Sequence, residues 1–383
     1  MPTGDKIRVT LFITELALGG TPRRVQALAE RLDRARFDPR VLALIPGGAL
    51  AGALRTAGVP VETLGVRHRV DAGAPFRLWA YLRRVRPQIL HGFNFHANLL
   101  AKVVGKKLAG VPTVVVSEAS VESAKRWHRV ALDRWTARWA DAHYVNAEAI
   151  RDKLMSRERV PADRIWTVRT GVDPKAFAPQ VPDDGLRSAL GIAPGDPVVV
   201  SVGRLAKYKG QEILLEACAL DPGRRWRLVF VGDGPARAAV GARASALGIA
   251  HRVVFAGARD EVAPFLALAD CVALASTEEG LPGSVLEAMA MARPVVATAV
   301  GGVPEAVADG VTGVLVPAGD AAALAQAIAA VVADPARAQA MGLAARERAE
   351  RDFNVDLMVQ RTEIMYETLM GVRGEISPGE PKA

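Results

Sequence analysis

The stretch DPVVVSVGRLAKYKGQEILLEACAL, residues 196–220, contains the structural unit from which the rest of the chain is built. It begins with a short apolar run of valines, which is typical of a buried strand. A glycine-containing loop follows, and the apolar content of residues 211–220 then indicates a helix. A strand, a loop and a helix in this order predict one step of a parallel α/β sheet.

The same alternation extends in both directions along the chain. Short apolar runs bounded by Pro or Gly predict further strands at residues 6–14, 40–45, 88–93, 112–118, 225–234, 251–257, 271–276, 294–298 and 312–317. Helical patterns lie between many of them, as at residues 21–35, 98–110 and 236–248. The pattern restarts after a Pro-rich linker near residues 171–185, so we predict two α/β domains, residues 1–174 and 175–353.

Composition places the chain among folded globular proteins. Its 383 residues, half of them apolar, exceed what one typical core accommodates. No run of about eighteen uncharged apolar residues occurs, so we expect no membrane-spanning helix. The N-terminus lacks a signal-peptide pattern, and the two distant cysteines, Cys218 and Cys271, are expected to be small buried side chains in a reducing compartment. These features predict a cytoplasmic protein.

Charge is distributed unevenly along the chain. Residues 1–175 contain 30 Lys and Arg against 16 Asp and Glu, a net charge of +14, and the remainder contains 19 against 25, a net charge of −6. A basic first half suits nucleic acid, an anionic membrane surface or an anionic substrate. A surface that only keeps the protein soluble explains the same asymmetry.

One predicted helix, SAKRWHRVALDRWTARWAD at residues 123–141, combines tryptophans with basic residues. Trp127, Trp135 and Trp139 are spaced by eight and four positions, which places them on one helical face. A helix that lies on a membrane surface has this pattern. A core helix whose tryptophans pack on the sheet has it too, and this second interpretation is the more usual one in α/β domains.

Candidate site residues lie in the loops that follow predicted strands, where open α/β sheets bind their ligands. Arg204 and Lys209 are two cations on one short loop and suit a diphosphate. Gly283 and Ser284 open a helix whose free N–H groups also suit phosphate. Glu287, one turn further on, can accept hydrogen bonds from both hydroxyls of a ribose. These residues predict a site for a nucleoside diphosphate that carries a further group.

The sequence does not match the motifs of several other nucleotide-binding, metal-binding and hydrolytic sites. The segment VGDGPAR (231–237) begins like a dinucleotide fingerprint, but Arg237 stands where a small residue is required. The sequence contains no P-loop, no His-Glu-x-x-His zinc motif and no nucleophile elbow. Since no His, Cys or carboxylate cluster has metal-ligand spacing either, we expect neither a metal nor a cofactor.

Five segments together carry a resemblance to a known family: SVGRL with KYKG (201–210), FVGDGP (230–235), VFAG (254–257), STEEGLPGSVLEAMA (276–290) and RPVVATAVGGVPE (293–305). They resemble family 4 of the retaining glycosyltransferases, also described as glycosyl transferases group 1. LALGGTPR (16–23) and TGVDPKAFAP (170–179) extend the likeness over nearly the whole chain. The resemblance implies the GT-B fold, in which two Rossmann-like domains face a cleft and a C-terminal helix, about residues 354–373, returns to the first domain.

The resemblance also implies a role for each candidate residue. Arg204 and Lys209 would bind the donor diphosphate, Glu287 would hold the ribose, and Glu279 would face the donor sugar as the first glutamate of the family's E-x7-E motif. The expected donor contacts are Gly280, Leu281 and Pro282 beside the sugar, Gly283 and Ser284 at the helix start and Gly19 and Gly20 near the phosphates, Gly257 with Arg259 near the base, and Gly203 in the loop of Arg204.

The sequence departs from the family pattern at one place. Many relatives have a His-x-His at the end of a strand, whereas this chain has LHGFNFHAN (90–98), with Phe93 at the second histidine position. His96 either replaces that histidine as a catalytic residue or only caps the next helix. His91 is expected to be a packing residue at the strand end.

The resemblance predicts a retaining glycosyltransferase that moves a sugar from a nucleotide diphosphate sugar, UDP-sugar before GDP-mannose, to a saccharide or lipid-linked acceptor. It predicts no nucleic-acid partner. The basic first half suggests an anionic acceptor and peripheral binding at the inner face of a membrane, with candidate contacts at Arg23, Arg24, Lys102, Lys106, Lys107, Lys125 and Arg126. A nucleotide-sugar epimerase and a non-catalytic nucleotide-binding subunit remain as alternatives.

Overall fold

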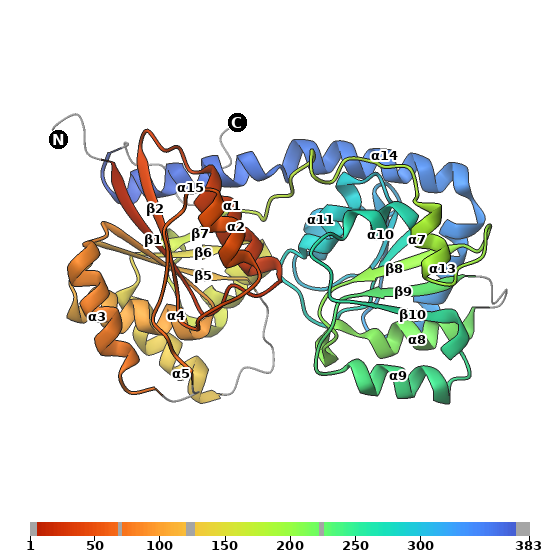
Figure 1. The fold of residues 1–383 in the computed structure, drawn as a ribbon, viewed down its shortest axis with the longest axis horizontal. Coiled ribbons are helices and arrows are strands. Elements are labelled where there is room, and N and C mark those ends of the chain that lie inside the picture. Colours follow the sequence, from red (N-terminus) through yellow and green to blue (C-terminus); the bar gives the residue numbers. More distant parts are fainter. Residues whose placement is uncertain (1–5, 68–70, 120–126, 222–225, 373–383) are drawn as a thin grey trace. The chain divides into compact units, whose positions relative to one another are not determined.

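The computed structural model describes residues 6–67, 71–119, 127–221 and 226–372. The chain forms two compact units: unit 1 comprises Met1–Thr170 and Val355–Ala383, and unit 2 comprises Gly171–Asn354 (Figure 1). Each unit contains one parallel sheet with helices packed against it.

The sheet of unit 1 has seven strands in the order β3-β2-β1-β4-β5-β6-β7, and every neighbouring pair is parallel. The strands are β1 (Ile7–Ile13), β2 (Phe37–Ala43), β3 (Val61–Thr63), β4 (Ile89–Phe93), β5 (Thr113–Glu118), β6 (Ala142–Val145) and β7 (Ile165–Thr167). The chain adds β2 and β3 on one side of β1 and β4 to β7 on the other. The direction of winding therefore reverses between β1 and β4.

Helices cover both faces of this sheet. Leu11 and Ile13 of β1 pack under α1 (Gly20–Arg31), α2 (Leu50–Thr56) and α15 (Val355–Leu369), whereas Phe12 packs under α3 (Ala74–Val85), α4 (Phe95–Leu100) and the π-helix η1 (Ala101–Leu108). The remaining helical segments are α5 (Trp127–Thr136), η2 (Ala137–Trp139), α6 (Glu148–Lys153), η3 (Leu154–Glu158) and η4 (Ala162–Arg164). Alternating side chains of a strand thus fill two separate apolar layers.

The C-terminal helix α15 belongs to unit 1, as the family resemblance implies. Arg36, which precedes β2, donates hydrogen bonds to Glu363 and Glu367 at 2.5 Å each. The backbone N–H of Asp33 donates to Glu363 at 2.7 Å. Both glutamate side chains are about one-tenth exposed, so this guanidinium compensates two largely buried carboxylates.

We therefore expect Arg36→Met to lower the free energy of unfolding by about 2 kcal/mol or more, because two largely buried carboxylates lose their cation. Arg40→Met is the matched control, since Arg40 pairs with Asp38 and both side chains are one-third exposed. Urea unfolding and hydrogen exchange of α15 measure the effect. Equal losses in the two variants would contradict this account of how α15 docks.

The sheet of unit 2 has six parallel strands in the order β10-β9-β8-β11-β12-β13. The strands are β8 (Val198–Val202), β9 (Arg227–Val231), β10 (Val253–Gly257), β11 (Cys271–Leu274), β12 (Val295–Thr298) and β13 (Gly313–Val316). β9 and β10 extend the sheet on one side of β8, and β11 to β13 extend it on the other. This sheet reverses its winding between β8 and β11.

The helical segments of unit 2 are α7 (Asp184–Ala189), η5 (Lys207–Lys209), α8 (Gln211–Leu220), α9 (Arg237–Ala246), η6 (Ala250–Arg252), α10 (Ala263–Leu268), α11 (Gly283–Ala290), α12 (Val303–Ala306), α13 (Ala321–Ala333) and α14 (Pro335–Asp352). No single described helix has the length and apolar character to cross a bilayer, although α13 and α14 meet that criterion jointly across a bend of 102°.

Two sequence interpretations have clear outcomes here. Cys218 and Cys271 are buried free thiols, as predicted, and burial raises their pKa to about 11 and about 12. The interpretation of the tryptophan helix as a core helix is wrong for two of its three tryptophans. Trp127 and Trp135 are 81% and 54% exposed, because α5 turns a different face inward, the one that carries the buried Asp133 and Thr136.

Candidate active site

The reversal of winding in unit 2 brings two predicted loops together. One loop follows β8 and carries Arg204 and Lys209, and the other follows β11 and carries Glu279. Because β8 and β11 are adjacent parallel strands, both loops emerge at the same edge of the sheet, and their helices depart on opposite sides. Open α/β sheets bind ligands at such a point.

Backbone contacts hold the two loops together. Thr277 donates to the carbonyl of Tyr208 from its N–H at 2.8 Å and from its hydroxyl at 3.2 Å. Gly210 has a φ of +65°, and a Cβ added to it would lie 1.9 Å from the carbonyl oxygen of Ala275. This close approach therefore requires glycine at position 210, and the contact fixes the backbone position of the preceding residue, Lys209.

Lys209 and Glu279 form an ion pair at the centre of this arrangement. Lys209 Nζ lies 2.6 Å from Glu279 Oε1, and the Ser276 hydroxyl donates to the same oxygen at 2.6 Å. The side chains of the lysine and the glutamate are 17% and 8% exposed. Two donors on one oxygen fix the orientation of the carboxylate, and the ammonium compensates its charge.

A third loop, which follows β12, packs against the backbone of Glu279. Gly301 has a φ of +53°, and a Cβ at this position would lie 1.8 Å from the carbonyl oxygen of Glu279. The N–H of Gly302 donates to the carbonyl of Gly280 at 2.9 Å, and Thr298 Oγ1 donates to the carbonyl of Ser276 at 2.6 Å. The ends of three adjacent strands, β8, β11 and β12, and the loops that follow them therefore fix the position of Glu279.

Arg204 differs from Lys209 in its surroundings. Its side chain is exposed, while its carbonyl accepts a hydrogen bond from the buried Gln211 amide at 3.1 Å. Gly203 precedes it with a φ of +152°, and a Cβ on the neighbouring Gly232 would lie 2.0 Å from the Gly203 oxygen. The backbone of Arg204 is therefore fixed, and its guanidinium faces solvent at the same sheet edge.

The helix that carries Glu287 begins where the sequence predicts. α11 starts at Gly283 after Pro282, without a side-chain cap and without an acidic residue in its first turn. Gly280, Leu281 and Pro282 are buried, Gly283 and Ser284 are half-buried, and Glu287 is half-buried one turn into the helix. An uncapped helix start presents N–H groups and a partial positive charge to an anion.

The segment predicted to meet a base lies at the end of β10, two strands from β8. Gly257 has a φ of +77°, and its carbonyl accepts a hydrogen bond from the N–H of Gly232 at 2.8 Å. Arg259 is exposed, and its Nε donates to the carbonyl of Ala256 at 2.9 Å. These bonds tie β10 to the loop after β9 and leave the arginine at the surface.

The predicted residues of unit 1 lie at its own reversal point, between β1 and β4. Gly19 and Gly20 are exposed at the start of α1, and a Cβ on Gly20 would meet nothing within 4 Å. His96 is exposed in the first turn of α4, where its ring packs edge-on against Phe95. It is the second residue of that helix and does not cap it.

His91 and Phe93 are core residues, which confirms the packing role predicted for His91. The two rings stack with centroids 4.2 Å apart, and His91 Nδ1 lies 2.6 Å from the hydroxyl of Tyr366. Burial, helped by the nearby charge of Arg24, holds the pKa of His91 well below its usual value. His91 is therefore neutral at physiological pH.

Three of the basic residues expected to contact an acceptor are instead buried or paired with a carboxylate within unit 1. Lys102 is buried and pairs with Asp133 at 3.0 Å, Lys106 binds Asp141, and Arg24 is buried beside Tyr144. Their charges were visible in the sequence, but the helical faces on which they lie were not. Lys125 and Arg126 lie outside the described residues.

Sequence reasoning missed Ser276, Thr277 and Gly301, which position Glu279. Ser276 and Thr277 lie three and two positions before Glu279, the first glutamate of the recognised motif, so their place at a strand end was a usable signal. Gly301 belongs to a Gly-Gly pair after β12, but nothing in the sequence indicates that its partner is the backbone of Glu279.

We expect Gly301→Ala to displace Glu279 and to destabilise unit 2 strongly. Gly310→Ala is the matched control, because Gly310 has a φ of +73° but a Cβ there would meet nothing within 4 Å. The control should lose only the conformational term of about 1–2 kcal/mol, and Gly301→Ala should lose at least about 2 kcal/mol more. Urea unfolding measures both, and similar losses would show that the close approach to Glu279 is unimportant.

Comparison with known proteins places these features in a family. Residues 18–176 match the family described as Glycosyltransferase Family 4, and residues 183–348 match Glycosyl transferases group 1. The chain is 38% identical over 371 residues to the D-inositol 3-phosphate glycosyltransferase of Mycobacterium marinum, covering 91% of this chain and 78% of that protein. It spans about half the length of other curated relatives with that name.

Two further similarities are informative. The chain is 31% identical over 289 residues to the 2-deoxystreptamine glucosyltransferase of Streptomyces kanamyceticus, covering 71% of this chain and 75% of that protein. The crystal structure of Anabaena HepE in complex with UDP and glucose matches with a TM-score of 0.83 and 24% identity, over 94% of this chain and 99% of that chain. Together with similar matches, this likeness establishes the predicted GT-B fold.

Proposed function

The chain belongs to glycosyltransferase family 4, the glycosyl transferases group 1, and from that premise we propose that it moves a sugar from a nucleotide diphosphate sugar to an acceptor hydroxyl. The observation that carries the proposal is the largely buried Lys209–Glu279 pair at the reversal point of the second sheet. A cation and an oriented carboxylate side by side suit a ligand with an anionic and a hydroxyl-rich end. A nucleotide sugar has both.

The diphosphate would lie among three groups with positive potential. Arg204 is exposed at the sheet edge, Lys209 comes from the same loop, and α11 begins without a cap on the neighbouring loop. An ammonium has three N–H donors, so Lys209 can retain Glu279 and still donate to a phosphate oxygen. These groups are fixed before the ligand arrives, and fixed charges stabilise a leaving diphosphate effectively.

The two glutamates would bind opposite ends of the donor. Glu279 would accept hydrogen bonds from hydroxyls of the transferred sugar, and Glu287 would accept them from the ribose. Gly257 and Arg259 would lie near the base. At Gly20 and Gly283 an added Cβ would meet nothing within 4 Å, so the packing of the described residues leaves space for a ligand there.

We propose a reaction that retains the anomeric configuration. The acceptor oxygen attacks the anomeric carbon on the face from which the diphosphate leaves, the bond from that carbon to the phosphate oxygen breaks, and the leaving diphosphate takes the acceptor proton. Positive charge develops on the sugar in the transition state, as in glycoside cleavage generally. Glu279 positions the sugar and remains unmodified; a glycosyl adduct on it would contradict this mechanism.

For the donor we propose a UDP-sugar, with GDP-mannose as the second candidate. The solved Anabaena relative binds UDP and glucose, which supports the uracil nucleotide. For the acceptor we propose a saccharide, a lipid-linked saccharide or a related polyol ring. The names of two relatives specify cyclitols, D-inositol 3-phosphate and 2-deoxystreptamine, so such rings belong in the acceptor panel.

Lys209→Met should reduce kcat/KM for sugar transfer by about 100-fold or more, because a fixed cation next to the leaving group is lost. Lys207→Met is the matched control, since Lys207 is exposed on the same 3₁₀ turn and should change the rate less than about twofold. Because Lys209→Met leaves the buried Glu279 carboxylate without its cation, melting curves of both single variants separate lost catalysis from lost stability. Equal rates in Lys207→Met and Lys209→Met would refute the assignment.

A thermal-shift panel of UDP-, GDP-, ADP- and dTDP-sugars identifies the donor. The correct nucleotide class should raise the melting temperature, with or without EDTA, and Glu287→Gln should abolish the rise. A response to none of them would count against the donor site. Sugar conversion without any acceptor would favour an epimerase, and binding without transfer or hydrolysis would favour a non-catalytic subunit.

A further inference from the structure

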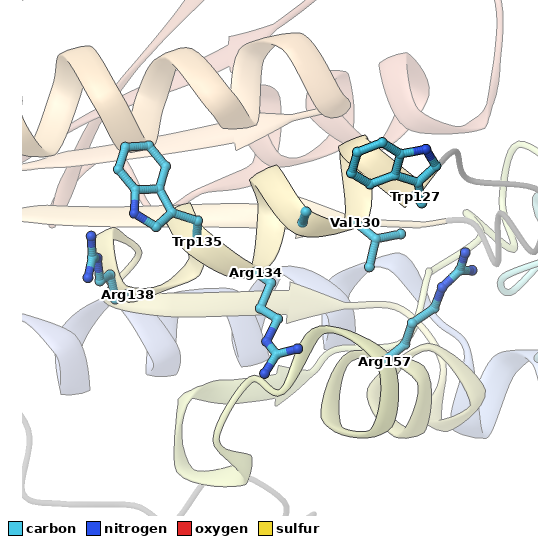
Figure 2. Close-up of a pocket in the computed structure, with 7 residues that line it drawn as sticks. Trp127, Val130, Arg134, Trp135, Arg138 and Arg157 are labelled. Atoms are coloured by element: carbon cyan, nitrogen blue, oxygen red, sulfur yellow. The ribbon is translucent and has the colours of Figure 1, made fainter.

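Unit 1 carries an open groove that the proposed reaction does not use. It has a volume of about 560 Å³ and is lined by Trp127, Val130, Ala131, Arg134, Trp135, Arg138 and Arg157. Figure 2 shows that the two indole rings project from α5, whereas Arg157 comes from the neighbouring segment η3. Large aromatic rings and arginines therefore share one surface.

The tryptophans of this groove are exposed far beyond what core packing requires. Trp127 is 81% exposed and Trp135 is 54% exposed. Arg138 lies over the rings of Trp135 and Trp139 at 5.5 and 5.4 Å, which orients the guanidinium along the aromatic surface. An amphipathic ring with an arginine beside it is typical of the interface between water and lipid.

The same character continues on adjacent helices. Phe76 and Trp79 of α3 stack with centroids 5.9 Å apart, and Phe76 is 69% exposed. Arg83 lies over Trp79, and Lys107 of η1 lies over Trp139 at 5.6 Å, which links η1 to η2. All four Phe and Trp side chains among the exposed large hydrophobics of the described residues lie on α3 or α5.

This surface is also cationic. Within the described elements α3, η1, α5, η2 and η3, the acidic residues are Asp133 and Glu158, and both are buried. The exposed charges on these elements are therefore positive, among them Arg83, Lys107, Arg134 and Arg138. A cationic surface with exposed indoles differs from a merely soluble one, because solubility does not require the aromatic rings.

We propose that the aromatic-basic face, formed by the exposed residues of α3, η1, α5, η2 and the groove, docks on a bilayer surface that contains anionic lipid. The indoles would enter the headgroup region, and the arginines and lysines would face lipid phosphates. A bilayer fits better than a small soluble anion, because the aromatic side chains are spread over several helices. The proposal does not rest on the identity of the donor.

Vesicle co-sedimentation with the full chain tests this face. The probes are phosphatidylcholine vesicles with and without phosphatidylglycerol, at low and high salt. The wild type should bind the anionic vesicles more strongly, and salt should weaken that binding. Trp127→Ser/Arg134→Glu should reduce the binding constant about tenfold or more, and Trp127→Ser alone should reduce the part that survives high salt.

The matched control is Arg337→Glu/Leu343→Ser on α14, which makes the same kinds of change at exposed residues of unit 2. It should bind like the wild type, and melting curves should show that all variants are folded. No binding to anionic vesicles, or equal losses in the groove and control variants, would overturn the proposal. Binding to heparin that equals vesicle binding and does not depend on Trp127 would instead indicate a soluble polyanionic partner.

Discussion

The reversal of strand order between β8 and β11 is the constraint on which the candidate site depends. The chain places β9 and β10 on one side of β8 and β11 to β13 on the other. The loops after the adjacent parallel strands β8 and β11 therefore leave the sheet side by side at the same edge. Lys209 and Glu279 are seventy positions apart in sequence, yet their side chains meet at 2.6 Å because of this reversal. Gly210 and Gly301 then permit the backbone approaches that fix the pair.

Much of this arrangement was predictable from the sequence because it follows from local patterns. Valine-rich runs bounded by Gly and Pro predicted most of the strands. β3, β6 and β7 were missed because β3 and β7 have only three residues each and the four-residue β6 contains His143. The loops that carry Arg204, Lys209 and Glu279 follow strands, so their shared edge was predictable too. The contact of Gly301 with Glu279 was not, since it joins two loops whose packing no local pattern encodes.

Burial explains the remaining differences between sequence and structure. Charge counting treated Lys102 and Arg24 as surface cations, but both lie on buried helix faces. Spacing alone could not decide whether the tryptophans of α5 face the sheet or solvent, because both faces of a helix show the same periodicity. Because two of these tryptophans are exposed, unit 1 has a basic aromatic face, whereas the candidate donor site belongs to unit 2.

The most direct test of the central claim is a crystal structure of the chain with UDP bound. The account predicts that the diphosphate lies within hydrogen-bond distance of Lys209 and Arg204 at the start of α11, with the ribose hydroxyls at Glu287. A diphosphate bound elsewhere, with Lys209 still engaged only with Glu279, would contradict the claim that the reversal point of the second sheet is the donor site.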